Sequence, residues 1–158
     1  MKDKYLELEK IIEEKCSKDI QFHSERTKDI ALILQEIYGG DKEAIIISAL
    51  LHDVAAEGEF KHHAEEGSKI IRETFKDRLN SSLLDKVCYC VRYHSIASPK
   101  PLEITPELIC VRDADKIDFL LTTSNTNSLY DEVSRSFLGN RSLDLYKKLE
   151  RIVKWYKK

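Results

Sequence analysis

Apolar residues recur at three- and four-residue spacing along nearly the whole chain, which is the pattern of amphipathic α-helices. The spacing predicts helices over residues 4–16, 20–38, 41–53, 63–77, 81–94, 105–121, 128–138 and 143–156. No segment alternates convincingly between apolar and polar residues, so no β-strand is expected. The predicted fold class is therefore all-α, a compact bundle of about seven to eight helices.

Several of the predicted helix ends carry recognisable signals. Gly39 and Gly40 end the second helix, and Asp41 can cap the third. Thr105 followed by Pro106 is typical of a helix start, with threonine as the cap and proline in the first turn. Loops are expected around residues 56–60, 96–104 and 122–127.

The third predicted helix differs from the others because residues 45–51 are apolar on nearly every side, interrupted only by Ser48. A helix without a polar face belongs in the centre of a fold. The terminal segment 146–158 is basic and amphipathic, so we expect a helix packed on the core with a solvated basic face.

Composition narrows the functional classes. The 158 residues suit one domain, and a net charge of −2 gives no basis for nucleic-acid binding by bulk charge. No apolar run is long enough to span a bilayer, and the first residues lack a signal-peptide pattern, so we expect a cytoplasmic protein without a membrane role. The four cysteines form no C-x-x-C pair and are expected to be reduced thiols of the core.

Three histidines and an aspartate lie on the inward stripes of different predicted helices, and a fourth histidine, His63, begins another predicted helix. The set is His23, His52, His63, His94 and Asp115. One buried histidine is usually explained by a hydrogen bond to a backbone carbonyl, but several on different helices need partners together. A divalent ion would satisfy them all at once, because neutral imidazole and carboxylate are ligands of such ions. Gly67, one turn after His63, is expected to leave space beside that ring.

The adjacent pair His52-Asp53 adds a geometric detail. Neighbouring residues on a helix diverge by about 100°, so the two side chains can straddle an extended site. The shorter aspartate arm would lie between two positions, which suits a carboxylate that bridges two ions about 3.5–4 Å apart.

The sequence Ala49-Leu50-Leu51-His52-Asp53 resembles the signature of the HD-domain superfamily, whose ligands occur in the order H…HD…D. His23, followed by Ser24-Glu25-Arg26, resembles the first ligand, and residues 111–116 resemble the last motif. Periodicity does not choose between Asp113 and Asp115; the family pattern, with the ligand after an alanine, selects Asp115. The resemblance covers residues 23–121. It implies an HD-domain bundle around a buried metal site, with the ligands within about 20–121 and the helices of 128–157 packed on them, all in one domain of 1–158.

Two further motifs resemble those of HD proteins that hold two ions. His63 with Gly67 resembles an H-x-x-x-G element, and His94 lies in a companion element one helix later. The implied ligand set is His23, His52, Asp53, His63, His94 and Asp115. The remaining histidine, His62, is expected to face solvent. No Gly-Tyr-Pro follows His94, so the resemblance does not extend to the HD-GYP subfamily and its cyclic-dinucleotide substrates.

The resemblance implies a metal-dependent phosphohydrolase, a phosphatase or phosphodiesterase, using one or two divalent ions of Mn, Fe, Co, Ni, Zn or Mg. Such ions activate a water for attack on phosphorus. Asp53 would orient the nucleophile, and Arg26 and Lys116 are candidates to neutralise phosphate charge. The expected partner is a small phosphorylated substrate, with a nucleotide preferred; the oligomeric state is not readable from the sequence.

Two alternatives remain open on the sequence. The same six ligands resemble those of mixed-valent di-iron oxygenases built on the HD scaffold. A non-catalytic module that binds a nucleotide or a protein partner would use the same bundle, although such modules are expected to lose ligands, and none is missing here. Specificity is expected to reside in residues 55–60, 96–104 and 122–138.

Overall fold

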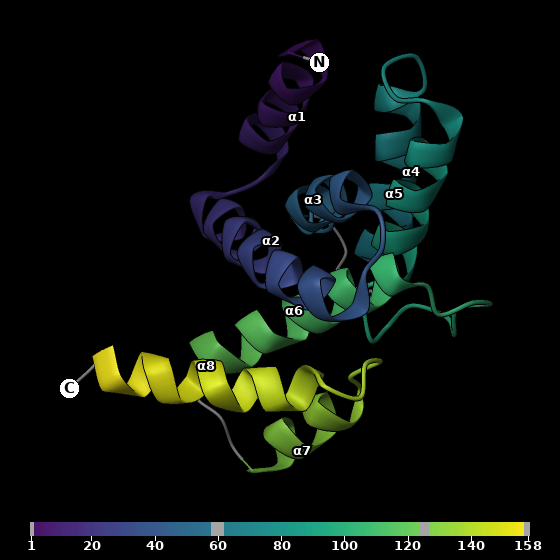
Figure 1. Cartoon of the computed structure of the whole chain (residues 1–158). Helices are drawn as coiled ribbons and strands as arrows, with labels where there is room; N and C mark the ends of the chain where they lie inside the picture. Colours follow the sequence, from purple (N-terminus) through teal and green to yellow (C-terminus); the bar gives the residue numbers. More distant parts are fainter. Residues whose placement is uncertain (1, 58–61, 124–126, 157–158) are drawn as a thin grey trace.

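The computed structural model describes residues 2–57, 62–123 and 127–156, and these parts of the chain are built from helices, turns and loops without a strand. The helices are α1 (Lys2–Lys15), α2 (Lys18–Tyr38), α3 (Lys42–Leu51), α4 (His63–Phe75), α5 (Ser81–Tyr93), α6 (Pro106–Thr122), α7 (Asn127–Arg135) and α8 (Ser142–Tyr156). The all-α prediction is confirmed, and every predicted helix is present in its predicted place (Figure 1).

The predicted end signals act as expected. Asp41 accepts a hydrogen bond from the Ala44 amide at 3.1 Å, and Thr105 caps α6 through the Leu108 amide at 3.1 Å. Gly39 ends α2 with a positive φ of 79°, a conformation that favours glycine. Two caps were missed. Ser17 accepts from the Ile20 amide at 3.3 Å, so α2 begins earlier than predicted, and Asn80 caps α5 by accepting from the Leu83 amide at 2.9 Å.

Three helices end two or more residues earlier than the sequence predicts. α3 ends at Leu51 rather than residue 53, α4 at Phe75 rather than 77, and α7 at Arg135 rather than 138. The first difference matters most, because it places His52 and Asp53 in a turn after α3. In this turn the Val54 amide donates to the Leu51 carbonyl at 3.0 Å. The bond spans three residues, whereas an α-helical bond spans four, so the chain turns more tightly here.

α3 lies in the centre of the molecule, as its uniformly apolar sequence predicts, and contacts α1, α2, α5 and α6 (Figure 1). Its opposite faces enter two different apolar cores. Ile47 and Leu51 pack with residues of α1, α4 and α5, whereas Ile45 and Ala49 pack with residues of α2, α6, α7 and α8. A helix of this kind can hold the residues that follow it at the boundary between the two cores.

The C-terminal helices pack beside α6, and α8 runs along it in Figure 1. Tyr146 of α8 is buried in the second core, whereas Ile152 of the same helix is 45 % exposed. No helix among the described residues is long and apolar enough to cross a membrane. Residues 58–60 of the predicted loop, 124–126 of the polar break and residues 157–158 of the terminal segment lie outside the described residues.

Candidate metal centre

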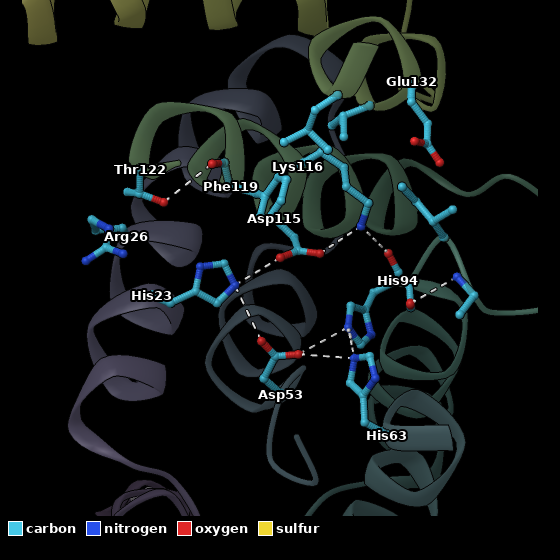
Figure 2. Close-up of a pocket in the computed structure, with 15 residues that line it drawn as sticks. His23, Arg26, Asp53, His63, His94, Asp115, Lys116, Phe119, Thr122 and Glu132 are labelled. Atoms are coloured by element: carbon cyan, nitrogen blue, oxygen red, sulfur yellow. Dashed lines mark hydrogen bonds and ion pairs between the residues drawn. The ribbon is translucent and has the colours of Figure 1, made fainter. Parts of the chain in front are cut away.

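Five segments of the chain meet at one cluster of histidine and aspartate side chains. His23 comes from α2, His52 and Asp53 from the turn after α3, His63 from the first residue of α4, His94 from the residue after α5, and Asp115 from α6. His52, His63 and His94 are buried. Figure 2 shows His23, Asp115, His63 and His94 arranged around the Asp53 carboxylate. The structure thus brings together all six residues that the sequence selected as ligands.

The first group in this cluster contains His23, His52, Asp53 and Asp115, and its ligand atoms lie within 4.8 Å of one another. Nε2 of His23 lies 3.0 Å from Nε2 of His52 and 2.9 Å from Oδ1 of Asp115. Oδ2 of Asp53 lies 3.5 Å from Nε2 of His23 and 3.3 Å from Nε2 of His52.

The second group contains Asp53, His63 and His94. Nε2 of His63 lies 3.1 Å from Nε2 of His94. The second carboxylate oxygen of Asp53, Oδ1, lies 3.3 Å from Nε2 of His63 and 3.4 Å from Nε2 of His94. Each carboxylate oxygen of Asp53 therefore faces one pair of imidazoles. This is the bridging position that the His52-Asp53 pair predicts.

Hydrogen bonds on the far side of three rings fix the atom that each ring offers. Nδ1 of His52 donates to the Ala49 carbonyl at 2.7 Å, and Nδ1 of His94 donates to the Val91 carbonyl at 2.6 Å. Nδ1 of His23 instead donates to the Asp118 carboxylate at 2.6 Å. With a proton on Nδ1, each neutral ring presents the lone pair of Nε2 to the cluster.

These donors fit divalent ions. Ligand atoms at about 2.0–2.2 Å from one ion lie roughly 3–4 Å from each other, the spacing found in both groups. Without an ion or an extra proton, the Nε2 lone pairs of His23 and His52 would face each other at 3.0 Å. Buried, converging lone pairs are unfavourable unless a positive charge lies between them. Imidazole and carboxylate donors without thiolate suit Mn, Fe, Co, Ni or Zn.

When no ion is bound, burial and the neighbouring charges together decide which residues of the cluster are protonated. Burial acts to lower the pKa of His23, but hydrogen bonds with Asp115 and Asp118 outweigh it and raise the pKa to about 9. Burial acts in the same direction on His52, whose pKa is nevertheless raised by the charge of Asp53. Burial acts to raise the pKa of Asp53, and the neighbouring His52 charge holds it well below its usual range. Protons and metal ions therefore compete for this cluster.

Lys116 and Arg26, the two predicted phosphate-binding cations, line a cleft that also contains the cluster residues, and each is paired with an acid. Nζ of the buried Lys116 donates to Oδ2 of Asp115 at 2.8 Å and to the His94 carbonyl at 2.9 Å. The Arg26 guanidinium donates from Nε and Nη2 to Asp118 at 2.7 and 3.1 Å. Lys116 thus connects two ligand-bearing segments, and Arg26 holds the acid behind His23.

Asp118 is the main site residue that the sequence analysis missed. It is 1 % exposed and binds both His23 and Arg26. One signal could have revealed it: Asp118 follows Asp115 by three residues, so both lie on the same face of α6. Phe119, one turn after Asp115 on α6, is 39 % exposed and lines the cleft.

The structure also shows the contacts of Asp113 and Gly67. Asp113 lies away from the cluster, where it accepts hydrogen bonds from the Leu138 and Gly139 amides and from the Ser142 hydroxyl. A Cβ atom on Gly67 would lie 3.3 Å from Val91, so this glycine permits close packing of α4 on α5. The space expected beside His63 stays a prediction. His62 is exposed and all four cysteines are buried free thiols, as expected.

A model of the HD domain family matches residues 21–120, a range that includes all six clustered residues. Comparisons with curated proteins and with solved structures found no match. The matched range begins within α2 and ends within α6. It therefore coincides with the part of the fold that supplies the cluster.

Proposed function

The chain belongs to the HD-domain family, and on this premise we propose that it is a metal-dependent phosphohydrolase acting on a nucleotide or another small phosphoester. The observation that supports this most directly is the position of Asp53. One of its oxygens faces the His23–His52 pair and the other faces the His63–His94 pair. A carboxylate shared by two sets of donors could hold two ions close together, as two-ion phosphoester hydrolysis uses them.

Divalent ions bound here would supply Lewis acidity toward the phosphate and a water of lowered pKa. The residues of the chain provide the rest. Asp53 orients the nucleophile between the two groups, and the buried hydrogen bonds of His52 and His94 to backbone carbonyls keep the rings fixed. Lys116 lines the cleft at hydrogen-bonding distance from Asp115, where its charge can stabilise the phosphate as negative charge develops.

The experiment that tests the proposal is elemental analysis of protein purified without added metal or chelator, together with phosphate release from small phosphoesters. We expect about one or two equivalents of transition metal, largely lost in Asp53→Ala together with hydrolysis. His62→Ala is the matched control, because this histidine is exposed and outside both groups; its metal content should equal that of the wild type.

Three outcomes would redirect the proposal. Two irons with oxygen consumption and no phosphate release would favour the oxygenase chemistry that the same ligand set allows. No metal in any sample, and no uptake of added Mn, Fe, Co or Ni, would leave a non-catalytic binding module as the better account. Equal metal and activity in wild type and Asp53→Ala would remove Asp53 from the site.

A further inference from the structure

The metal cluster forms the floor of a cleft of about 740 Å³, which is the size of a site for a whole small molecule. Several of the residues that line the cleft are apolar, and together they are called here the apolar wall. It consists of Ile96, Ala97, Phe119, Leu129 and Val133. A phosphate needs only the polar floor, so the wall is available for the organic part of the substrate.

The apolar wall is built from the elements that carry the ligands, together with α7. Phe119 follows Asp115 by one turn of α6 and is 39 % exposed, and Ile96 follows His94 by two residues and is 46 % exposed. Leu129 and Val133 are one turn apart on α7. Single exposed apolar residues are ordinary, but several gathered in a concave site beside polar groups are typical of a ligand-binding surface.

The rim of the cleft is polar, with Glu132 as its acidic residue. Glu132 is exposed, adjoins Val133 on α7 and projects toward the cleft in Figure 2. Its carboxylate can accept hydrogen bonds and disfavours a second anionic group nearby. A group that is apolar on its face and carries N–H donors at its edge matches this combination, whereas an alkyl chain would make no use of the acceptor.

We propose that the apolar wall binds the base of a nucleotide whose phosphate lies at the Asp53 cluster, with Phe119 packed against the ring face and Glu132 accepting a hydrogen bond from the ring edge. The inference rests on the proposed phosphohydrolase function and assigns specificity to residues outside the ligand set. Packing of a base on an aromatic side chain tolerates different bases; Glu132 adds the preference for bases with an N–H donor at that edge.

The test compares ligands that differ only in the base. Binding of the four common nucleoside 5′-monophosphates and of ribose 5-phosphate to the Mn(II)-loaded full chain is measured by microscale thermophoresis at 4 °C, before phosphate release becomes detectable. At least one nucleotide should bind about tenfold or more tightly than ribose 5-phosphate. Phe119→Ala should remove most of this advantage without changing ribose 5-phosphate binding, and Phe119→Tyr should retain it. Glu132→Ala should weaken the same nucleotide severalfold.

Phe22→Ala is the matched control, because Phe22 is 60 % exposed on α2 and does not line the cleft; it should keep the full advantage. The inference is overturned if ribose 5-phosphate binds as tightly as every nucleotide, or if Phe119→Ala and Phe22→Ala behave alike. Metal content and hydrolysis of ribose 5-phosphate are measured in parallel. If these persist while the base advantage is absent, the base site is wrong and the phosphohydrolase stands; if both are absent, the proposed function itself fails.

Discussion

At the scale of single residues, the histidines of the cluster differ in what supports them from behind. His52 and His94 donate to neutral carbonyls three residues earlier. His23 donates to the Asp118 carboxylate, which is itself held by two hydrogen bonds from Arg26. A charged acceptor makes a ring a more basic ligand than a carbonyl does. The group that contains His23 should therefore hold its ion more tightly than the His63–His94 group.

We expect Asp118→Asn to weaken the tighter Mn(II) site by about 10–100-fold, because the variant loses the negative charge behind His23 and the ion pair with Arg26. Titration calorimetry of metal-stripped protein measures this change. Asp85→Asn is the matched control, since Asp85 is an exposed residue of α5 that forms an ion pair with Arg72 of α4. Unchanged affinity in Asp118→Asn would contradict the supporting role assigned to this carboxylate.

A second residue-scale prediction concerns pH. In metal-stripped protein the pKa of His23 is about 9, above the value of about 6.5 for an unfolded chain. A raised histidine pKa gives stability that is fully present below pH 6.5 and is lost as pH rises through about 9. The raised pKa of His52 acts in the same direction. Asp53 and Asp115, whose pKa values are lowered, stay ionised throughout this range.

The free energy of unfolding of stripped protein, from urea titrations, should therefore decrease between pH 6 and pH 10. His23→Gln should make this decrease smaller, because glutamine does not titrate. The difference between wild type and variant isolates the contribution of His23 from that of other groups. A variant that loses stability with pH as steeply as the wild type would show that His23 does not carry the effect.

At the scale of helices, α6 uses two nearby aspartates for different purposes. Asp115 faces the metal cluster, whereas Asp113 holds the segment between α7 and α8 through the Leu138 and Gly139 amides and the Ser142 hydroxyl. Residues two apart on a helix point about 200° apart, so the two carboxylates cannot share a site. α6 thus joins the metal centre to the C-terminal helices.

Asp113→Ala should lower the free energy of unfolding by about 1–3 kcal/mol, because it leaves buried donors without an acceptor, while the metal content stays at the wild-type level. Asp115→Ala, in contrast, should lower the metal content. Asp131→Ala, at an exposed position of α7, serves as the control for both. Loss of metal in Asp113→Ala with intact circular dichroism would contradict this division of roles.

At the scale of the whole molecule, the cluster joins segments that are far apart in the sequence. Its residues come from α2, the turn after α3, α4, the residue after α5, and α6. Ions bound to these segments would hold the folded state together and would bind the unfolded chain more weakly, because the donors converge only in the fold. Metal binding should therefore stabilise the global fold rather than one helix.

Addition of Mn(II) at about 100 times its dissociation constant should stabilise the stripped protein by about 2.7 kcal/mol, which corresponds to a rise in Tm of roughly 5–10 °C for a chain of this size. Differential scanning calorimetry measures the shift. Asp53→Ala should show little or no shift, and His62→Ala should show the full one. Equal shifts in the two variants would mean that Mn(II) stabilises the protein at another site.

The positions and ends of the helices could be predicted because they depend on residues close together in the sequence. The 3.6-residue periodicity located every helix, and Asp41, Thr105 and Gly39 fixed ends that depend only on neighbouring residues. The uniformly apolar segment 45–51 required a central position, which α3 has. Periodicity placed candidate ligands such as His23 and His94 on inward stripes, but the resemblance to HD-domain motifs selected Asp115 and completed the ligand set.

Only the tertiary structure decided how these elements meet. The turn after α3 places Asp53 between the two pairs of imidazoles, and α6 lies close enough to α2 for Asp118 to reach both His23 and Arg26. Gly67 shows the same limit, because its role depends on Val91, a residue of another helix. Spacing along one helix fixes which face a side chain occupies, but the partner on that face comes from the packing of distant segments.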